Sequence, residues 1–150
     1  MSAPFRFGLE RVREIRAHDE DQAKERFAAS LNARVRGEAV LRAAEERLRQ
    51  AQSGVVAPSL GPLTGATLVA RQAWVERLEH DRADAKLRMT SYEADLQRRR
   101  AELQQASQKR EVLDQLKERR REEHRLEAER AESANLDEMA LQMHARRAAA

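Results

Sequence analysis

The stretch from Thr67 to Arg147 contains neither Gly nor Pro. Gly loosens a helix and Pro interrupts it, so the absence of both over so long a stretch predicts one uninterrupted helix. Such a helix would be roughly 120 Å long at about 1.5 Å per residue. This single feature limits the fold more than any other in the chain.

Apolar side chains recur along the first half of this stretch at alternating steps of three and four residues. Nine of the twelve positions in the repeat are apolar or aromatic, and most residues between them are charged. The twelve positions are Val75, Leu78, Arg82, Ala85, Met89, Tyr92, Leu96, Arg99, Leu103, Ala106, Arg110 and Leu113. A heptad pattern sustained in this way is typical of a coiled coil.

A second helical pattern precedes this one, and a loop separates the two. We expect helix one over about residues 9–52, a loop over 53–66 and helix two over about 67–147. The loop holds three of the five glycines and two of the three prolines. Thr64 or Thr67 is a suitable cap for the second helix. The sequence therefore predicts an all-α fold, an antiparallel coiled-coil hairpin forming a single elongated domain over residues 1–150.

The apolar pattern of helix one has spacings of mostly three or four, with a longer gap at Asp19. Its members are Leu9, Val12, Ile15, Ala23, Phe27, Leu31, Val35, Leu41, Ala44 and Leu48. Gly37 is the one helix-weakening residue in this segment, at a cost of about 1 kcal/mol relative to Ala. A glycine here would also allow the partner helix to approach closely.

The two helices differ in length, so part of helix two lacks a partner. Helix one reaches only from Thr67 to roughly Arg110 of helix two, and the C-terminal helix is expected to overhang. Residues 118–132 hold eleven charged residues in fifteen, many at the spacing of helical ion pairs. Leu136, Met139 and Met143 then return at helical spacing, and such a stripe on an overhang favours oligomerisation or a partner protein.

Composition argues against several classes of function. The chain is 37% charged, has no Cys and carries a net charge of only +3, because basic and acidic residues are interleaved. The four histidines lie far apart and no phosphate-binding loop is present, so we expect no enzyme, metal or cofactor. Nearly absent aromatic residues argue against nucleic-acid binding. No segment reaches the length of a membrane span, and the N-terminus lacks the apolar segment of a secretion signal.

Each end of the chain carries a short, distinctive motif. The N-terminal motif is Phe5-Arg-Phe-Gly-Leu9-Glu-Arg-Val12-Arg-Glu-Ile15-Arg16, followed by Asp19, Glu20 and Ala23. The C-terminal motif is Leu136-Asp137-Glu138-Met139-Ala140, followed by Arg146 and Arg147. Both motifs resemble those of the FliJ family of flagellar export proteins. One departure is Arg13, where the family commonly has an apolar residue.

The resemblance implies a two-helix coiled-coil stalk of the flagellar type III export apparatus, cytoplasmic and peripherally associated with the inner membrane. Its partners would be the hexameric export ATPase, the export gate membrane protein and certain substrate chaperones, with no nucleic acid and no membrane insertion. The ATPase-side candidates are Phe7, Leu9, Val12, Leu136, Asp137, Glu138 and Met139. The candidates for the export gate, at the hairpin tip, are Trp74 and Leu78 by resemblance, and Leu48 by geometry.

Three other interpretations fit the same pattern. One is the equivalent stalk of a type III secretion injectisome, and another is a structural coiled coil that self-associates through its C-terminal end. A basic coiled coil that binds nucleic acid is the third, although the arginine triplets at 98–100 and 119–121 spread around the helix rather than forming one patch.

Overall fold

The computed structural model describes residues 4–54 and 64–148. Within these ranges the chain forms two helices and no strand: α1 spans Glu10–Gln52 and α2 spans Gly65–Ala148. Contacts group into two units, one of Met1–Glu20 with Gln105–Ala150 and one of Asp21–Gln104. The all-α hairpin with a longer C-terminal helix is confirmed, whereas a single domain over the whole chain stays a prediction.

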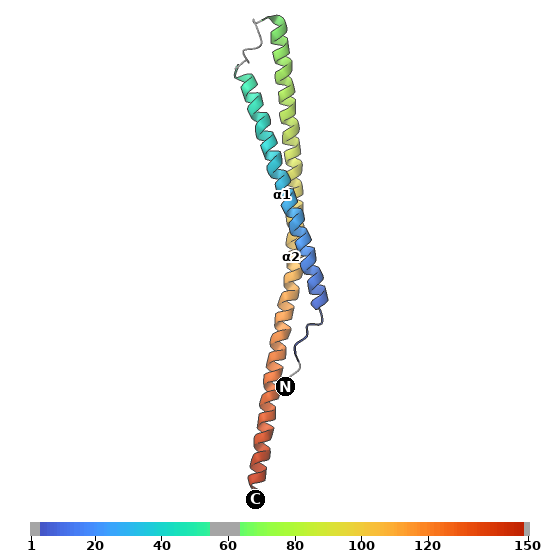
Figure 1. Cartoon of the computed structure of the whole chain (residues 1–150), viewed down its shortest axis with the longest axis vertical. Coiled ribbons are helices and arrows are strands. Elements are labelled where there is room, and N and C mark those ends of the chain that lie inside the picture. The colour runs from blue at the N-terminus through green and yellow to red at the C-terminus, as the bar shows by residue number, and fades with distance from the viewer. Residues whose placement is uncertain (1–3, 55–63, 149–150) are drawn as a thin grey trace. The chain divides into compact units, whose positions relative to one another are not determined.

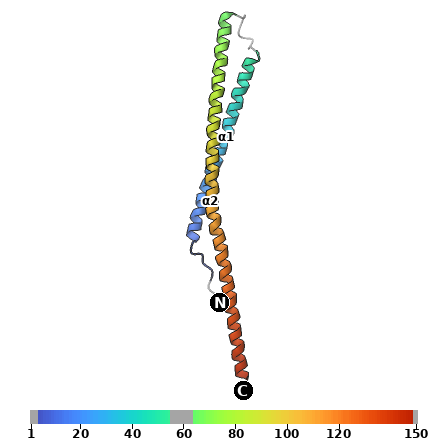
Figure 2. The same ribbon diagram turned by 180° about the vertical axis from the view of Figure 1, so that it is seen from behind.

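In the unit of residues 21–104, α1 and α2 lie side by side in both views (Figures 1 and 2). The Ser30 hydroxyl donates to the Asp95 carboxylate at 2.8 Å. Nearer the loop, the Arg71 guanidinium donates to the carbonyl of Ala51 at 3.4 Å. From the first contact to the second, the residue number rises along α1 and falls along α2. The two helices are therefore antiparallel.

The twelve-position apolar repeat of α2 is the predicted seam, the face that packs against α1. It is buried as expected. All twelve predicted positions except Arg82 are buried or half-buried. The buried apolar side chains of the second unit are Ala23, Ala44, Leu48, Leu78, Ala85 and Met89. Only six described side chains are in this group and three of them are alanines, so the apolar core is a thin strip between two helices rather than a globular interior.

The seam of α1 differs from the apolar pattern read from the sequence. Val12, Ile15, Leu31 and Val35 were expected on the buried face, but 40–54% of each is exposed. A strict spacing of three and four instead runs through buried or half-buried residues of α1: Arg16, Glu20, Ala23, Phe27, Ser30, Arg34, Gly37, Leu41, Ala44, Leu48 and Ala51. This spacing matches the heptad of α2. Three of its polar members, Glu20, Ser30 and Arg34, pair with residues of α2, whereas Arg16 pairs with Asp19 of α1. Several bulky aliphatic residues are left outside.

Gly37 marks a close approach between the helices. A Cβ atom built on Gly37 would lie 2.6 and 2.7 Å from two ring carbons of Tyr92, and 3.5 Å from the sulfur of Met89. Only a residue without a side chain lets the Tyr92 ring lie against α1 at this depth. The close approach expected at Gly37 is therefore present.

Local signals set the helix ends beside the loop. Gly54, which follows α1, has a φ of 74°, the left-handed conformation in which helices commonly end. At the start of α2, the Thr64 backbone N–H donates to the Thr67 hydroxyl at 2.8 Å, and the Thr67 N–H donates to the Thr64 hydroxyl at 3.3 Å. This reciprocal pair has the geometry of a capping box, with Thr64 as the N-cap.

Candidate functional site

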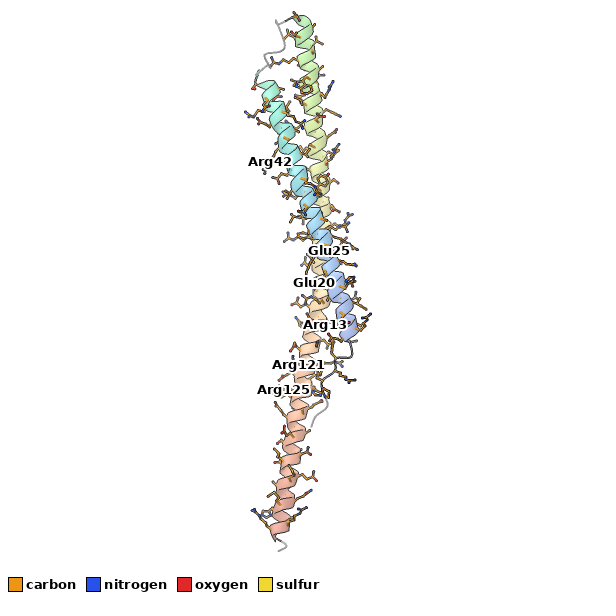
Figure 3. The ribbon with its side chains drawn as sticks, viewed as in Figure 1. Arg13, Glu20, Glu25, Arg42, Arg121 and Arg125 are labelled. Atoms are coloured by element: carbon orange, nitrogen blue, oxygen red, sulfur yellow. The ribbon has the colours of Figure 1, made fainter. Side chains whose placement is uncertain are left out.

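Ionic contacts join the helices in the unit of residues 1–20 and 105–150. The Arg13 guanidinium donates to Asp114 at 2.6 Å, and the Lys117 ammonium donates to Glu10 at 2.8 Å. Figure 3 shows Arg13 and Glu20 on the same stretch of α1. Arg13 is the residue that departs from the family pattern, and the cross-helix carboxylate of Asp114 compensates for the missing apolar side chain.

Glu20 is the most deeply buried member of this ionic cluster. Its side chain is 6% exposed and accepts from the Arg110 guanidinium and from the Ser107 hydroxyl, the latter at 3.3 Å. Arg110 also bonds Asp114, which links this pair to Arg13. A buried carboxylate needs such partners because it has lost its hydration.

The ionic contacts shift the pKa values of Glu10, Arg13, Arg110 and Asp114. The hydrogen bond from Lys117 lowers the pKa of Glu10, and the hydrogen bond from Arg13 lowers the pKa of Asp114. Burial opposes both shifts but is the smaller influence. The hydrogen bonds to Asp114 and Glu20 raise the pKa values of Arg13 and Arg110. These four groups are therefore more firmly charged in the folded hairpin.

Acid is expected to weaken the helix pairing in this unit. Because the folded pKa values of Glu10 and Asp114 are lowered, their stabilisation is complete well above the ordinary values of 4.5 and 3.8, and is lost as the pH falls below them. Thermal melts followed by circular dichroism at pH 7 and pH 3 measure the effect. The variant Asp114→Asn, which no longer titrates there, should show a smaller drop between the two pH values. An equal drop in both proteins would contradict the assignment to Asp114.

The lead-in before α1 lies against α2 in the same unit. The rings of Phe5 and His124 are in edge contact with centroids 5.7 Å apart. Phe5 lies between two shallow surface hollows, one of which includes Arg121, Arg125 and Ala128. Figure 3 shows Arg121 and Arg125 on α2 beside this lead-in. The lead-in thus covers α2 as far as Ala128.

Beyond Ala128, every described residue of α2, from Glu129 to Ala148, is exposed. Within its own unit, no other described segment lies beside this part of α2 in either view (Figures 1 and 2). Just before it, Arg125 forms ion pairs with Glu122 and Glu129 on its own helix, and these raise its pKa. Such pairs support a helix that lacks a neighbour.

The seven ATPase-side candidates fall into two groups along this unit. Phe7 is half-buried, and Leu9 and Val12 are 39% and 40% exposed. Leu136 and Met139 are 57% and 52% exposed, and Asp137 and Glu138 are exposed between them. The Phe5–His124 contact fixes the register, and residue 136 lies about 18 Å further along α2 at about 1.5 Å per residue. The seven ATPase-side candidates therefore do not form one contiguous patch.

The three tip candidates differ in accessibility. Trp74 is 50% exposed, with the Arg77 guanidinium 6.0 Å above its ring. Leu48 and Leu78 are each 3% exposed and sit in the seam between the helices. A partner could touch these two leucines only if the helices separated. Of the three, only Trp74 offers a surface to a partner.

The described residues contain no group of three or more His, Asp or Glu side chains placed to hold a metal ion. Over the same ranges, neither helix has an apolar segment capable of crossing a membrane. The pKa shifts described above come from ion pairs and hydrogen bonds along and between the helices.

A family model, Flagellar FliJ protein, matches residues 5–149, which is nearly the whole chain. The chain belongs to the FliJ family. No similar protein was found among curated proteins or among solved structures. As a FliJ-family protein, the chain is a coiled-coil component of the flagellar protein-export apparatus, and the resemblance noted at both termini is confirmed.

The ionic cluster of Glu10, Arg13, Glu20, Arg110, Asp114 and Lys117 was not foreseen as a site. Two signals pointed toward it: Arg110 interrupts the apolar repeat of α2, and Arg13 replaces an apolar residue of the FliJ pattern. Neither residue alone identifies the cluster. Pairing them requires the register of the two helices, which only the structure supplies.

Proposed function

We propose that this FliJ-family protein is a non-enzymatic stalk that binds the hexameric flagellar export ATPase through the exposed C-terminal end of α2. The observation that carries the proposal is the apolar–acidic segment Leu136–Met139, exposed on a helix without a described neighbour. Exposed apolar side chains next to carboxylates are suited to a protein interface. Family membership supplies the setting, the export apparatus.

Helix geometry places the apolar side chains of this segment on one face. Leu136, Met139 and Met143 follow at steps of three and four, whereas Leu141 lies on a different face of the same helix. Met143 is 57% exposed and Leu141 is 71% exposed. The segment therefore offers one apolar stripe and, at Leu141, an internal control for position.

Replacing Leu136 and Met139 together by Asp is expected to weaken binding of the export ATPase at least tenfold, because a hot-spot pair is lost from the stripe. Pull-down of the ATPase and stimulation of its hydrolysis measure the effect. Leu141→Asp, with the same chemical change on another face, should leave both nearly unchanged. Unchanged binding by the double variant would remove the ATPase role of the C-terminal segment.

At the loop end, we propose that Trp74 contacts the export gate membrane protein. Half of its surface is exposed, and tryptophan is enriched among residues that dominate binding energy. Leu48 and Leu78 are omitted from this proposed contact because they are buried. Trp74→Ala should weaken binding to the cytoplasmic domain of the gate protein while the melting temperature stays the same, and unchanged binding would argue against the contact. Handling of substrate chaperones is a further proposed role, based on family membership alone.

A further inference from the structure

A shallow groove of about 130 Å³ lies along one edge of the helix pair in the unit of residues 21–104. Its lining is Ala33, Arg36, Gly37 and Val40 from α1, and Ala85, Arg88 and Tyr92 from α2. On each helix these positions are mostly three or four residues apart, so each helix contributes one continuous ridge. None of these residues belongs to the ATPase-side or tip-side candidates.

The floor of the groove is apolar because its residues have little or no side chain. Ala33, Gly37 and Ala85 leave space between the helices, and the Tyr92 ring fills only the part directly against Gly37. Val40 stands at the rim with 53% of its surface exposed. An apolar side chain from outside could therefore be buried here.

Two arginines flank this apolar floor without a partner of their own. Within the part of the chain that the structure describes, neither Arg36 nor Arg88 has an ion pair or a hydrogen bond, and the Tyr92 hydroxyl has no hydrogen-bond partner. The neighbouring Arg34, in contrast, is paired with Glu38 at 3.6 Å. None of the residues that line the groove is acidic. The groove is thus positive at its edges and apolar at its base.

We propose that this groove binds a segment of a partner protein in which a carboxylate side chain stands next to an apolar one. Guanidinium groups on both sides match a carboxylate in charge and in hydrogen-bond geometry, and the nearby apolar floor excludes water from the contact. A phosphate group would use the arginines but leave the floor exposed, so the acidic–apolar peptide fits better. This proposal does not depend on the proposed ATPase contact, which uses residues of the other unit.

The test uses the full-length chain in flagellated cells, with the photo-crosslinker p-benzoylphenylalanine in place of Val40. The matched control carries it in place of Leu87, which is 72% exposed but does not line the groove. We expect a crosslink specific to Val40, on a partner peptide with Asp or Glu beside an apolar residue. Arg36→Glu with Arg88→Glu should lower the yield about tenfold or more, and replacing the partner's carboxylate by Arg should restore it.

Circular dichroism checks that the charge-reversed protein keeps its helices, and Arg36→Gln with Arg88→Gln serves as a milder variant. Because both arginines lie at the groove edge, we expect both variants to fold. Any of four results would overturn the proposal: no crosslink specific to Val40, a crosslinked peptide without acidic residues, a crosslink to RNA, or a yield that neither pair of arginine substitutions changes.

Discussion

Replacing Leu48 by Ala is expected to lower the free energy of unfolding by about 3 kcal/mol, within the range for leucines truncated in a buried site. Leu48 is 3% exposed and lies in the seam, where three of the six buried apolar side chains described for this unit are alanines. Few side chains in a seam between only two helices can move into the space that the lost atoms leave. Urea denaturation followed by the circular dichroism of the helices measures the change.

Leu87→Ala is the matched control for this prediction, because it makes the same chemical change at a side chain that is 72% exposed. We expect the free energy of unfolding to change by less than about 0.5 kcal/mol. If Leu48→Ala and Leu87→Ala had equal effects, the burial of Leu48 would be contradicted. If Leu48→Ala lost binding to the export gate protein while keeping its full helix content, Leu48 would belong to the proposed gate contact after all.

The two helices differed in how well their buried faces could be predicted. The seam of α2 was readable because Leu78, Met89 and most other members are apolar and the spacing is strict. On α1 the strict spacing runs through residues such as Glu20 and Ser30, while competing aliphatic residues lie outside it. Apolar periodicity therefore points to the aliphatic residues outside the seam. The burial of polar residues such as Glu20 and Ser30 depends on their partners on the other helix.

The candidate site was predictable only in part, for a related reason. Exposure of the C-terminal segment followed from the expected difference in helix lengths. The separation between Leu9 and Leu136 depends on where the lead-in meets α2, which the Phe5–His124 contact reveals. The arginine-edged groove combines Arg36 and Arg88, which are distant in sequence, so no local pattern could identify it.

Gly37→Ala is the second substitution with a large expected effect. Helix propensity alone would predict that it raises the free energy of unfolding, and we expect the opposite. In a helix interior alanine is more stable than glycine by about 1 kcal/mol. At this position the new methyl group would meet two carbons of the Tyr92 ring at 2.6 and 2.7 Å, inside van der Waals contact. Overpacking of this kind costs about 1–3 kcal/mol. We therefore expect Gly37→Ala to lower the free energy of unfolding by about 1 kcal/mol, measured in urea.

A double-mutant cycle with Tyr92 separates the two opposing effects. In a Tyr92→Ala background the ring is gone and only the helix propensity remains, so Gly37→Ala should raise the free energy of unfolding by about 1 kcal/mol. The sign of the same substitution thus reverses with the residue across the seam. A stabilising effect in both backgrounds would show that the ring can move aside without cost. A destabilising effect in both would mean that the close contact of α1 is with the backbone of α2 rather than with the ring.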